Sequence, residues 1–418
     1  ATYYDGQTVT KAEENLVLYS QEFNNVNWGL FQITISANST TAPDGTTTAD
    51  SLVNDGTNNF HGTRFLNIIP SNTEPKTLSA FFKANQITNV SIAIGNTSVA
   101  TFDLTAGTVS KTAGVDYVSS SITALADGWY RCSLTSTASV FGFFWLNSTN
   151  NPTYGAEYGY EIFTGTAGDL VYIWGAQLEQ RDTVTAYQPT TTQAITNYIP
   201  TLLTAPANSA RFDHNPVTGE SLGLLVEEQR TNLLTYSEEF DNASWSKSAV
   251  TVQSNVIIAP DGTLTGALLD DASASFGNIN KAVLSLANSA YYFSVYIKST
   301  GVATNVRMDL YTTTGEQLFV VFNSATGAYH SGSAVIYSTS SVGNGWYRIS
   351  LSATGSGTTN ARVYPSGDSA GATGGIYFWG AQLEAGAFPT SYVKTQASQV
   401  TRSADSASMV GTNFSDWY

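Results

Sequence analysis

Hydrophobic and polar residues alternate with a period of two along much of this chain. The run Arg348–Ala353 alternates strictly, and Arg131–Ser136 does the same in the first half of the chain. Ser289–Lys298 combines β-branched and aromatic residues with interspersed polar positions. Such runs predict half-buried β-strands. We find no segment with the 3.6-residue period of a long amphipathic helix.

Turn residues separate these runs at intervals of roughly ten residues. Gly, Asn, Asp and Pro dominate the breaks, and two of them are Pro43–Gly45 and Pro260–Gly262. In such a turn Pro presets φ and Gly accepts the positive φ that other residues avoid. Short strands with turns at this spacing are typical of antiparallel sandwiches. We therefore predict an all-β protein with two tandem jelly-roll β-sandwich domains.

Four blocks of sequence recur in the same order in the two halves of the chain. Three of them return 217 residues later, and these pairs are Asn15–Phe23 with Asn232–Phe240, Ala42–Thr46 with Ala259–Thr263, and Gly128–Arg131 with Gly345–Arg348. The fourth block, Trp174–Glu179, returns 205 residues later as Trp379–Glu384, so the first copy has about 12 extra residues before it. Recurrence over this length indicates a duplicated domain.

The duplication sets the expected domain boundaries. They are a lead-in segment at 1–14, a first module at 15–190, a linker at 191–231, a second module at 232–395 and a tail at 396–418. Each module has the size of an ordinary domain. Within the linker, apolar runs flank the turn Asn215–Gly219, which predicts an ordered linker with a small β-hairpin.

Composition and charge narrow the function classes. Charged residues make up only 12% of the chain, and 17 Lys plus Arg against 32 Asp plus Glu give a net charge of −15. A nucleic-acid partner would be repelled, so we predict none. No apolar run approaches the ~20 residues that span a bilayer, so no membrane insertion is expected. Cys132 is the single cysteine, which excludes an intrachain disulfide.

Candidate catalytic chemistry is sparse. His61, His214 and His330 lie in three different parts of the chain, and none of them is duplicated. No nucleophile elbow, zinc-protease helix, phosphate-binding loop or EF-hand pattern occurs. We therefore predict that the protein is not an enzyme. A pair of Asp or Glu side chains that meet by folding would still permit glycoside hydrolysis, so a glycan depolymerase remains an alternative.

The aromatic residues fall into a repeated and an unrepeated set. The repeated tryptophans are expected in the cores; they are Trp28 and Trp245, Trp129 and Trp346, and Trp174 and Trp379. The unrepeated residues are candidates for carbohydrate binding: Trp145, Tyr154, Tyr158, Tyr160, Tyr311, Tyr329 and Tyr364. The first copy's extra stretch, Asn151–Tyr160, offers flat rings and hydroxyls that suit sugars. Its alternative role is a long hairpin that covers the sandwich edge.

One repeated pair of acids is a candidate for metal binding. Glu22 and Glu239 follow the first strand of each module, where a carboxylate could bind a structural Ca²⁺ ion or simply cap the turn. Asp44 and Asp261 are explained by their turns.

The repeated blocks resemble modules of tailed-bacteriophage virion proteins. The resemblance extends to Arg211–His214 and Gly223–Asn232, and such modules are similar to the jelly-roll carbohydrate-binding modules of families four and nine. Where those modules often carry an Asp-Asp-Val-like segment that helps to hold Ca²⁺, this chain has Trp174-Gly175 and Trp379-Gly380. In the phage proteins a stretch like Val400–Asp405 leads into a further concanavalin-A-like domain, which implies that this chain is a fragment.

Residues and resemblance together predict a non-catalytic carbohydrate-binding protein on the virion surface, in a tail or fibre. Its expected partners are a poly- or oligosaccharide and other virion proteins, in an extracellular location. A purely structural virion spacer without a ligand is the first alternative, and the depolymerase is the second.

Overall fold

The computed structural model describes residues 1–65, 72–138, 141–155, 159–271, 276–301, 305–315, 317–367 and 372–408. Regular structure in these ranges consists of β-strands and one short 3-10 turn, η1 (Ala126–Gly128). The predicted all-β class is therefore confirmed. Within the same ranges no helix has the length and apolar character needed to cross a membrane.

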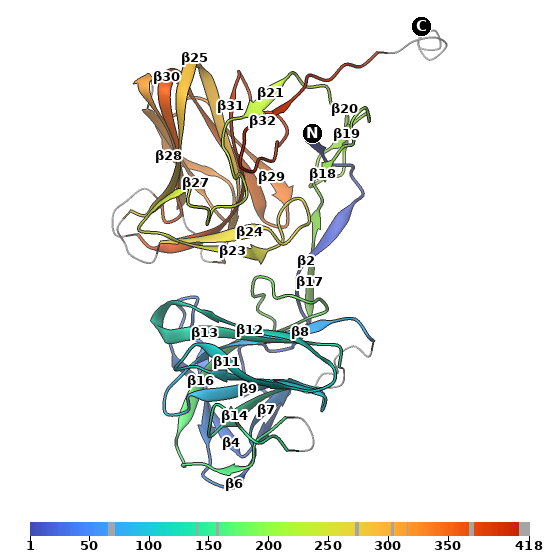
Figure 1. Cartoon of the computed structure of the whole chain (residues 1–418), viewed down its shortest axis with the longest axis vertical. Coiled ribbons are helices and arrows are strands. Elements are labelled where there is room, and N and C mark those ends of the chain that lie inside the picture. Colours follow the sequence, from blue (N-terminus) through green and yellow to red (C-terminus); the bar gives the residue numbers. More distant parts are fainter. Residues whose placement is uncertain are drawn as a thin grey trace. The chain divides into compact units, whose positions relative to one another are not determined.

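The chain divides into two compact units, each with its own sandwich (Figure 1). One unit is Glu13–Asn197, and the other combines Ala1–Ala12 with Tyr198–Tyr418. The predicted modules at 15–190 and 232–395 lie within these units. The first residues of the chain thus belong to the same unit as the second sandwich.

The first sandwich consists of two six-stranded antiparallel sheets. One sheet contains, in spatial order, β11 (Thr108–Ala113), β10 (Ser98–Asp103), β9 (Asn89–Ile94), β14 (Gly142–Asn147), β7 (His61–Phe65) and β3 (Trp28–Phe31). The other contains β12 (Tyr117–Ala124), β13 (Trp129–Ser136), β8 (Lys76–Lys83), β16 (Leu170–Glu179), β5 (Ala49–Asn54) and β4 (Ile33–Thr40). A separate pair is formed by β6 (Asn58–Asn59) and β15 (Phe163–Thr164).

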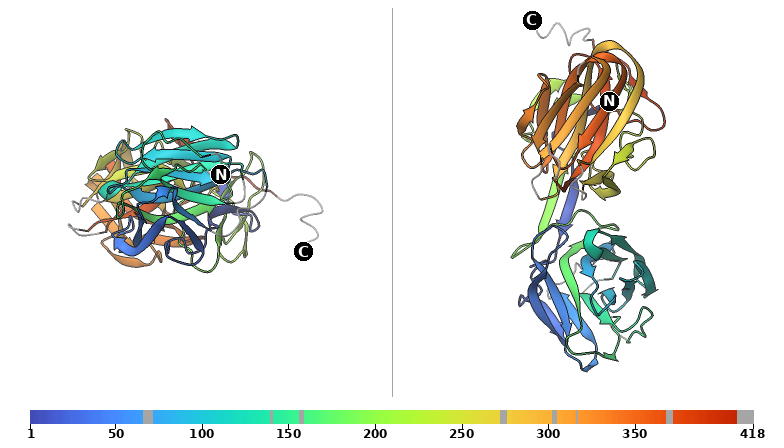
Figure 2. Two further views of the ribbon diagram at one scale, coloured as in Figure 1. Left: turned by 90° about the horizontal axis from the view of Figure 1, so that it is seen from below. Right: turned by 90° about the vertical axis from the view of Figure 1, so that its left-hand side faces the viewer.

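The second sandwich repeats this layout, but two of its strands run through both layers (Figure 2). They are β25 (Asn278–Ser299) and β30 (Trp346–Tyr364), with 22 and 19 residues. Ser289–Lys298 of β25 pairs with the start of β30 in one layer, and Ile279–Val283 pairs with the end of β30 in the other. The alternating runs that the sequence marked as separate short strands are therefore parts of longer ones.

The other strands of the second sandwich extend these two layers. One layer adds β22 (Ser246–Ser248), β26 (Asn305–Gly315), β27 (Gln317–Asn323) and β28 (Tyr329–Gly332). The other adds β23 (Thr251–Ile257), β24 (Gly266–Asp271), β31 (Gly374–Ala385) and β29 (Tyr337–Gly343). The two layers correspond strand by strand to those of the first sandwich, so both domains are jelly-roll sandwiches as predicted.

The repeated tryptophans are all buried. Trp28 and Trp245 lie in the two main cores, with 4% and 2% of their surface exposed. Trp129 and Trp174 form a smaller apolar cluster with Phe81. Their structural role agrees with the expectation from the duplication.

The repeated blocks also close each sandwich with the same hydrogen bonds. The side-chain amide of Asn15 donates to the carbonyls of Ala176 (2.9 Å) and Gln188 (2.7 Å), and its oxygen accepts two backbone N–H groups. Asn232 makes the four equivalent hydrogen bonds in the second sandwich. Nearby, the buried carboxylate of Glu179 accepts two hydrogen bonds from Thr185. We refer to these contacts in each sandwich as its clasp.

A two-stranded ribbon continues from each clasp. The ribbons are β2 (Val9–Asn15) with β17 (Ile195–Pro200), and β21 (Arg230–Asn232) with β32 (Val400–Arg402). The lead-in and the linker also pair, through β1 (Thr2–Tyr3) and β18 (Leu203–Thr204). The predicted hairpin is present as β19 (Phe212–His214) and β20 (Ser221–Leu224), which confirms the ordered linker.

Candidate functional site

One sheet of the first sandwich carries aromatic side chains on its outer side. Along β14, Phe144 and Leu146 enter the core, while Phe143 and Trp145 point outward and stack at 4.9 Å. Trp145 lies opposite Gly62 of β7. A Cβ at Gly62 would lie 2.5 Å from the indole ring, so only glycine allows this close approach. We name the outward side of β9, β14 and β7 the first outer face.

The predicted aromatic loop folds over this face. The ring of Tyr160 lies 4.6 Å from that of Phe60 and 5.9 Å from that of Trp145. As a result Trp145 is only 2% exposed, whereas Tyr160 is half-buried. Trp145 therefore supports the accessible rings from below. Tyr158 lies outside the described residues.

A chain of polar groups runs beside these rings. The hydroxyl of Tyr154 is 2.7 Å from that of Thr101, which is 2.6 Å from that of Ser91, and Asn147 donates to Ser91. The ammonium of Lys111 lies 4.8 Å from the centre of the Tyr154 ring. Burial raises the pKa of Tyr154, so its hydroxyl is protonated at neutral pH. The structure thus brings Trp145, Tyr154 and Tyr160 together at one surface.

The corresponding face of the second sandwich has different chemistry. We name the outward side of β26, of the end of β30 and of the start of β25 the second outer face. Both Tyr311 and Tyr364 lie on it, and the guanidinium of Arg362 lies 5.6 Å from the centre of the Tyr311 ring. Tyr364 is 5% exposed and stacks on Phe276 at 4.5 Å. Of these two predicted residues, only Tyr311 offers a partly accessible ring.

An ion pair lies on the same face. Arg307 contacts Asp309 through two nitrogen–oxygen pairs, at 2.6 and 3.2 Å. Its guanidinium also lies 4.1 Å from the centre of the Phe319 ring. The charges of Arg307 and Asp309 therefore compensate each other directly.

Tyr329, another predicted binding residue, does not lie on the second outer face. It is 44% exposed on the edge strand β28 and stacks on Tyr337 of β29 at 4.6 Å and 12°. Its partner across the strand pair is Phe322, a core residue, so Tyr329 is at the open edge of the sandwich and not on its outer face.

The two predicted metal ligands lie on exposed turns. The backbone N–H groups of Glu22 and Glu239 donate to Tyr19 and Tyr236, which closes each turn. Among the described residues no group of three or more His, Cys, Asp or Glu side chains could hold a metal ion. The geometry thus supports the turn role of these residues, and the calcium site remains an expectation from sequence.

The three histidines lie on separate strands, and the buried acid Asp50 is held by backbone hydrogen bonds. His61, His214 and His330 belong to β7, β19 and β28. The ring of His61 is fully buried against Phe163, and burial lowers its pKa. Burial raises the pKa of Asp50, whose carboxylate accepts two backbone N–H groups.

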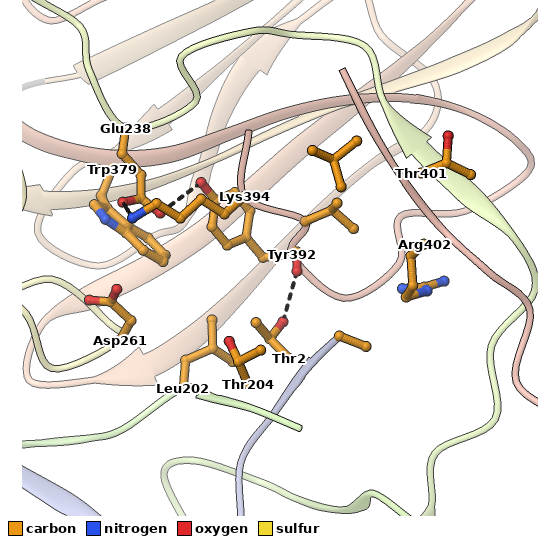
Figure 3. A pocket seen from close by; sticks show the side chains of 13 residues that line it. Thr2, Leu202, Thr204, Glu238, Asp261, Trp379, Tyr392, Lys394, Thr401 and Arg402 are labelled. Carbon is orange, nitrogen blue, oxygen red and sulfur yellow. Dashed lines mark hydrogen bonds and ion pairs between the residues drawn. The ribbon is translucent and has the colours of Figure 1, made fainter. Parts of the chain in front are cut away.

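A pocket of about 330 Å³ lies in the unit of the second sandwich (Figure 3). The lead-in, the linker and the clasp region line it, with Trp379 on one side. Glu238 accepts a hydrogen bond from Tyr392 (3.0 Å) and pairs with Lys394 (2.6 Å). Burial raises the pKa of Glu238 although Lys394 acts in the opposite direction. Glu238, Tyr392 and Lys394 thus satisfy one another within this pocket.

Sequence reasoning did not single out the charged residues of the second outer face. Arg307, Asp309 and Tyr311 occupy alternate positions of β26, and this period of two places them on one side. That signal was available in the sequence. The position of Arg362 beside them follows only from the pairing of β30 with β26.

Comparisons with known proteins give distant likenesses. No protein-family model and no curated protein matches the sequence. Among solved structures, the CBM22-1–CBM22-2 tandem domain of Paenibacillus barcinonensis Xyn10C is similar over 90% of this chain and 99% of that one, with 10% identity and a TM-score of 0.26. The enzymatically active domain of tailspike protein 4 from bacteriophage CBA120 is similar over 36% of this chain and 21% of that one, with 15% identity and a TM-score of 0.25. The fold assignment therefore rests on the strand topology described above.

Proposed function

We propose that this protein is a non-catalytic carbohydrate-binding protein that binds a poly- or oligosaccharide through the outer faces of its two sandwiches. The first outer face is the observation that carries the proposal. It presents the half-buried rings of Tyr154 and Tyr160, which are supported by Trp145 and by the buried network of Thr101, Ser91 and Asn147. Aromatic faces stack on sugar rings, and neighbouring polar groups bond the hydroxyls.

The binding of a short saccharide is expected to be weak. A di- or trisaccharide has on the order of 20 to 30 heavy atoms, and at ~0.3 kcal/mol per atom this corresponds to a dissociation constant of about a micromolar or weaker. A polysaccharide with many copies of the epitope is therefore the better probe.

The biological setting that we propose is the virion surface of a tailed bacteriophage, in a tail or fibre with other virion proteins. The resemblance of the repeated blocks to virion modules supports this setting. It would place the protein outside the cell, where host glycans are accessible.

The test is affinity electrophoresis of the whole chain in gels that contain one polysaccharide each, with and without Ca²⁺. We expect retardation by at least one polysaccharide class. Tyr160→Ala should weaken binding of that polysaccharide about tenfold, because stacking of a sugar on one aromatic ring contributes ~1 to 1.5 kcal/mol. Tyr198→Ala is the matched control, since Tyr198 is exposed on β17 outside both faces.

A structural spacer is the second candidate function. It is favoured by the low exposure of Trp145. It is also favoured by the clasps, because their hydrogen bonds join the first strand of each sandwich to its last strand. A folded protein that no polysaccharide retards would support the spacer and overturn the proposal.

A further inference from the structure

The two outer faces present different groups at equivalent positions of the same framework. In the first sandwich, Phe143 lies between Ala93 of β9 and Arg64 of β7. In the second, Arg362 lies between Asp309 of β26 and Asn280 of β25. Ala93 and Asp309 hold the same place in the matching runs Asn89–Ile94 and Asn305–Leu310. The duplication has therefore placed a guanidinium where the first sandwich has the phenyl ring of Phe143.

The charges on the second outer face do not cancel. Arg307 is neutralised by its ion pair with Asp309, at 2.6 and 3.2 Å. Arg362 lies opposite Asp309 in the strand pair but forms no salt bridge with any described carboxylate. Its guanidinium hydrogen-bonds the Tyr364 hydroxyl, and its Nε atom is buried without a hydrogen-bond partner among the described residues. Its side chain is half-buried over the Tyr311 ring, so the planar group is held in place rather than free in solvent. One positive charge remains on this face of a chain whose net charge is −15.

A fixed guanidinium next to a tyrosine ring suits one class of sugar. Arginine donates two parallel hydrogen bonds to a carboxylate, and such charge-assisted bonds are stronger than neutral ones. The adjacent Tyr311 ring supplies a stacking surface for the sugar that carries the acid. The strongly negative chain as a whole repels polyanions, so retention of one would have to come from a local site.

We propose that the second outer face binds an acidic glycan, with the Arg362 guanidinium bonded to a sugar carboxylate and Tyr311 beneath the ring. This inference rests on the proposed glycan-binding function and specifies the ligand class of one of its two faces. At the equivalent position the first outer face has Phe143 in place of the guanidinium.

The test uses polygalacturonate and its fully methyl-esterified form, two polymers that differ in the charge of one group. The whole chain should be retarded by the acidic polymer and at least about tenfold less by the ester. Arg362→Gln should weaken binding to polygalacturonate by about tenfold or more. Arg362→Lys, which keeps the charge but loses the planar fork, should give an intermediate loss.

The control variant is Lys83→Gln, which makes the same change in net charge on the opposite sheet of the first sandwich. It should leave binding to polygalacturonate unchanged, and the melting temperatures of all variants show whether each is folded. Equal losses for Lys83→Gln and Arg362→Gln, or equal binding of the polymer and its ester, would overturn the inference. Binding to neutral polysaccharides alone would overturn it while leaving the proposed function intact, whereas no binding to any polysaccharide would remove both.

Discussion

At the scale of single residues, burial separates the aromatic side chains that hold the fold from those that can meet a ligand. Trp129 is 1% exposed and donates from its indole nitrogen to the carbonyl of Thr41 (3.2 Å). Trp346 is fully buried at the repeated position. Tyr160 is accessible in part and packs at the rim of the first outer face. These residues belong to the same amino-acid class but have different roles.

Removal of a repeated indole should therefore destabilise its module strongly. Trp129→Ala or Trp346→Ala leaves a large cavity and should lower the free energy of unfolding by about 3 to 5 kcal/mol. Urea denaturation followed by tryptophan fluorescence measures the change. Tyr160→Ala removes a half-buried ring that packs on Phe60 and should cost less, about 1 to 2 kcal/mol. If Tyr160→Ala proved as damaging as Trp129→Ala, the loop would be part of the core and not a binding edge.

The burial of Trp145 shows what a single sequence does not reveal at this scale. Its lack of a counterpart among the repeated blocks set it apart from the core tryptophans, yet at 2% exposure it is as buried as Trp245. However, its exposure depends on Phe60 and Tyr160, which reach it from other parts of the chain. Such long-range coverage leaves no local pattern, so the sequence could place Trp145 on a strand but not beneath other rings.

At the scale of elements, the clasp explains why the same blocks recur. Asn15 and Asn232 each join the first strand of a module to its last strand and to the returning chain. Their contacts are buried, and each side chain satisfies four backbone groups. The motif therefore specifies closure of the sandwich, and the unrepeated residues are left to vary in function.

Loss of either clasp amide should have the same effect in its own sandwich. Asn15→Ala and Asn232→Ala leave several buried backbone groups unpaired, and at ~1 to 3 kcal/mol per group each should cost about 3 kcal/mol or more. Thermal denaturation should show one shifted transition in each variant. The exposed Asn150 serves as control, and Asn150→Ala should shift neither transition. A clearly smaller effect at Asn232 than at Asn15 would contradict the equivalence of the two clasps.

The sequence predicted these elements well where structure is local. Alternation and turn residues located the strands, and the linker hairpin follows from Asn215–Gly219. The continuity of β25 and β30 was not predicted, because one strand that changes layers reads as two runs with different buried faces. The second outer face was missed for a related reason: Arg362 meets Asp309 only through strand pairing across more than fifty residues.

At the scale of the whole molecule, three distant segments meet in the unit of the second sandwich. Arg211 of the linker donates to the carbonyl of Thr2 (3.3 Å) and to Glu227 (2.7 Å), and it also bonds Asp405. Arg402 lies 2.9 Å from the same Glu227 carboxylate. The lead-in, linker and tail are thus tied together by one largely buried ionic cluster.

This cluster predicts an acid-sensitive transition. Although burial opposes the charged form, hydrogen bonds from Ser391 and Arg211 hold the pKa of Glu227 below its usual value. The folded state then binds protons less readily than the unfolded chain, so the contribution is complete above the unfolded pKa of about 4.3 and is lost as pH falls through the folded value. The unit that contains Ala1–Ala12 and Tyr198–Tyr418 should therefore lose stability below about pH 4.

Glu227→Gln should weaken that unit at neutral pH by about 3 to 5 kcal/mol, because it leaves buried arginines without their partner. It should also flatten the acid dependence of the same transition in calorimetry between pH 7 and pH 3. Glu228→Gln is the matched control, since the neighbouring Glu228 side chain is 52% exposed and its ion pair with Arg230 contributes little. The transition of the Glu13–Asn197 unit should stay in place in both variants. If Glu227→Gln shifted both transitions or neither, the cluster would not be what joins these three segments.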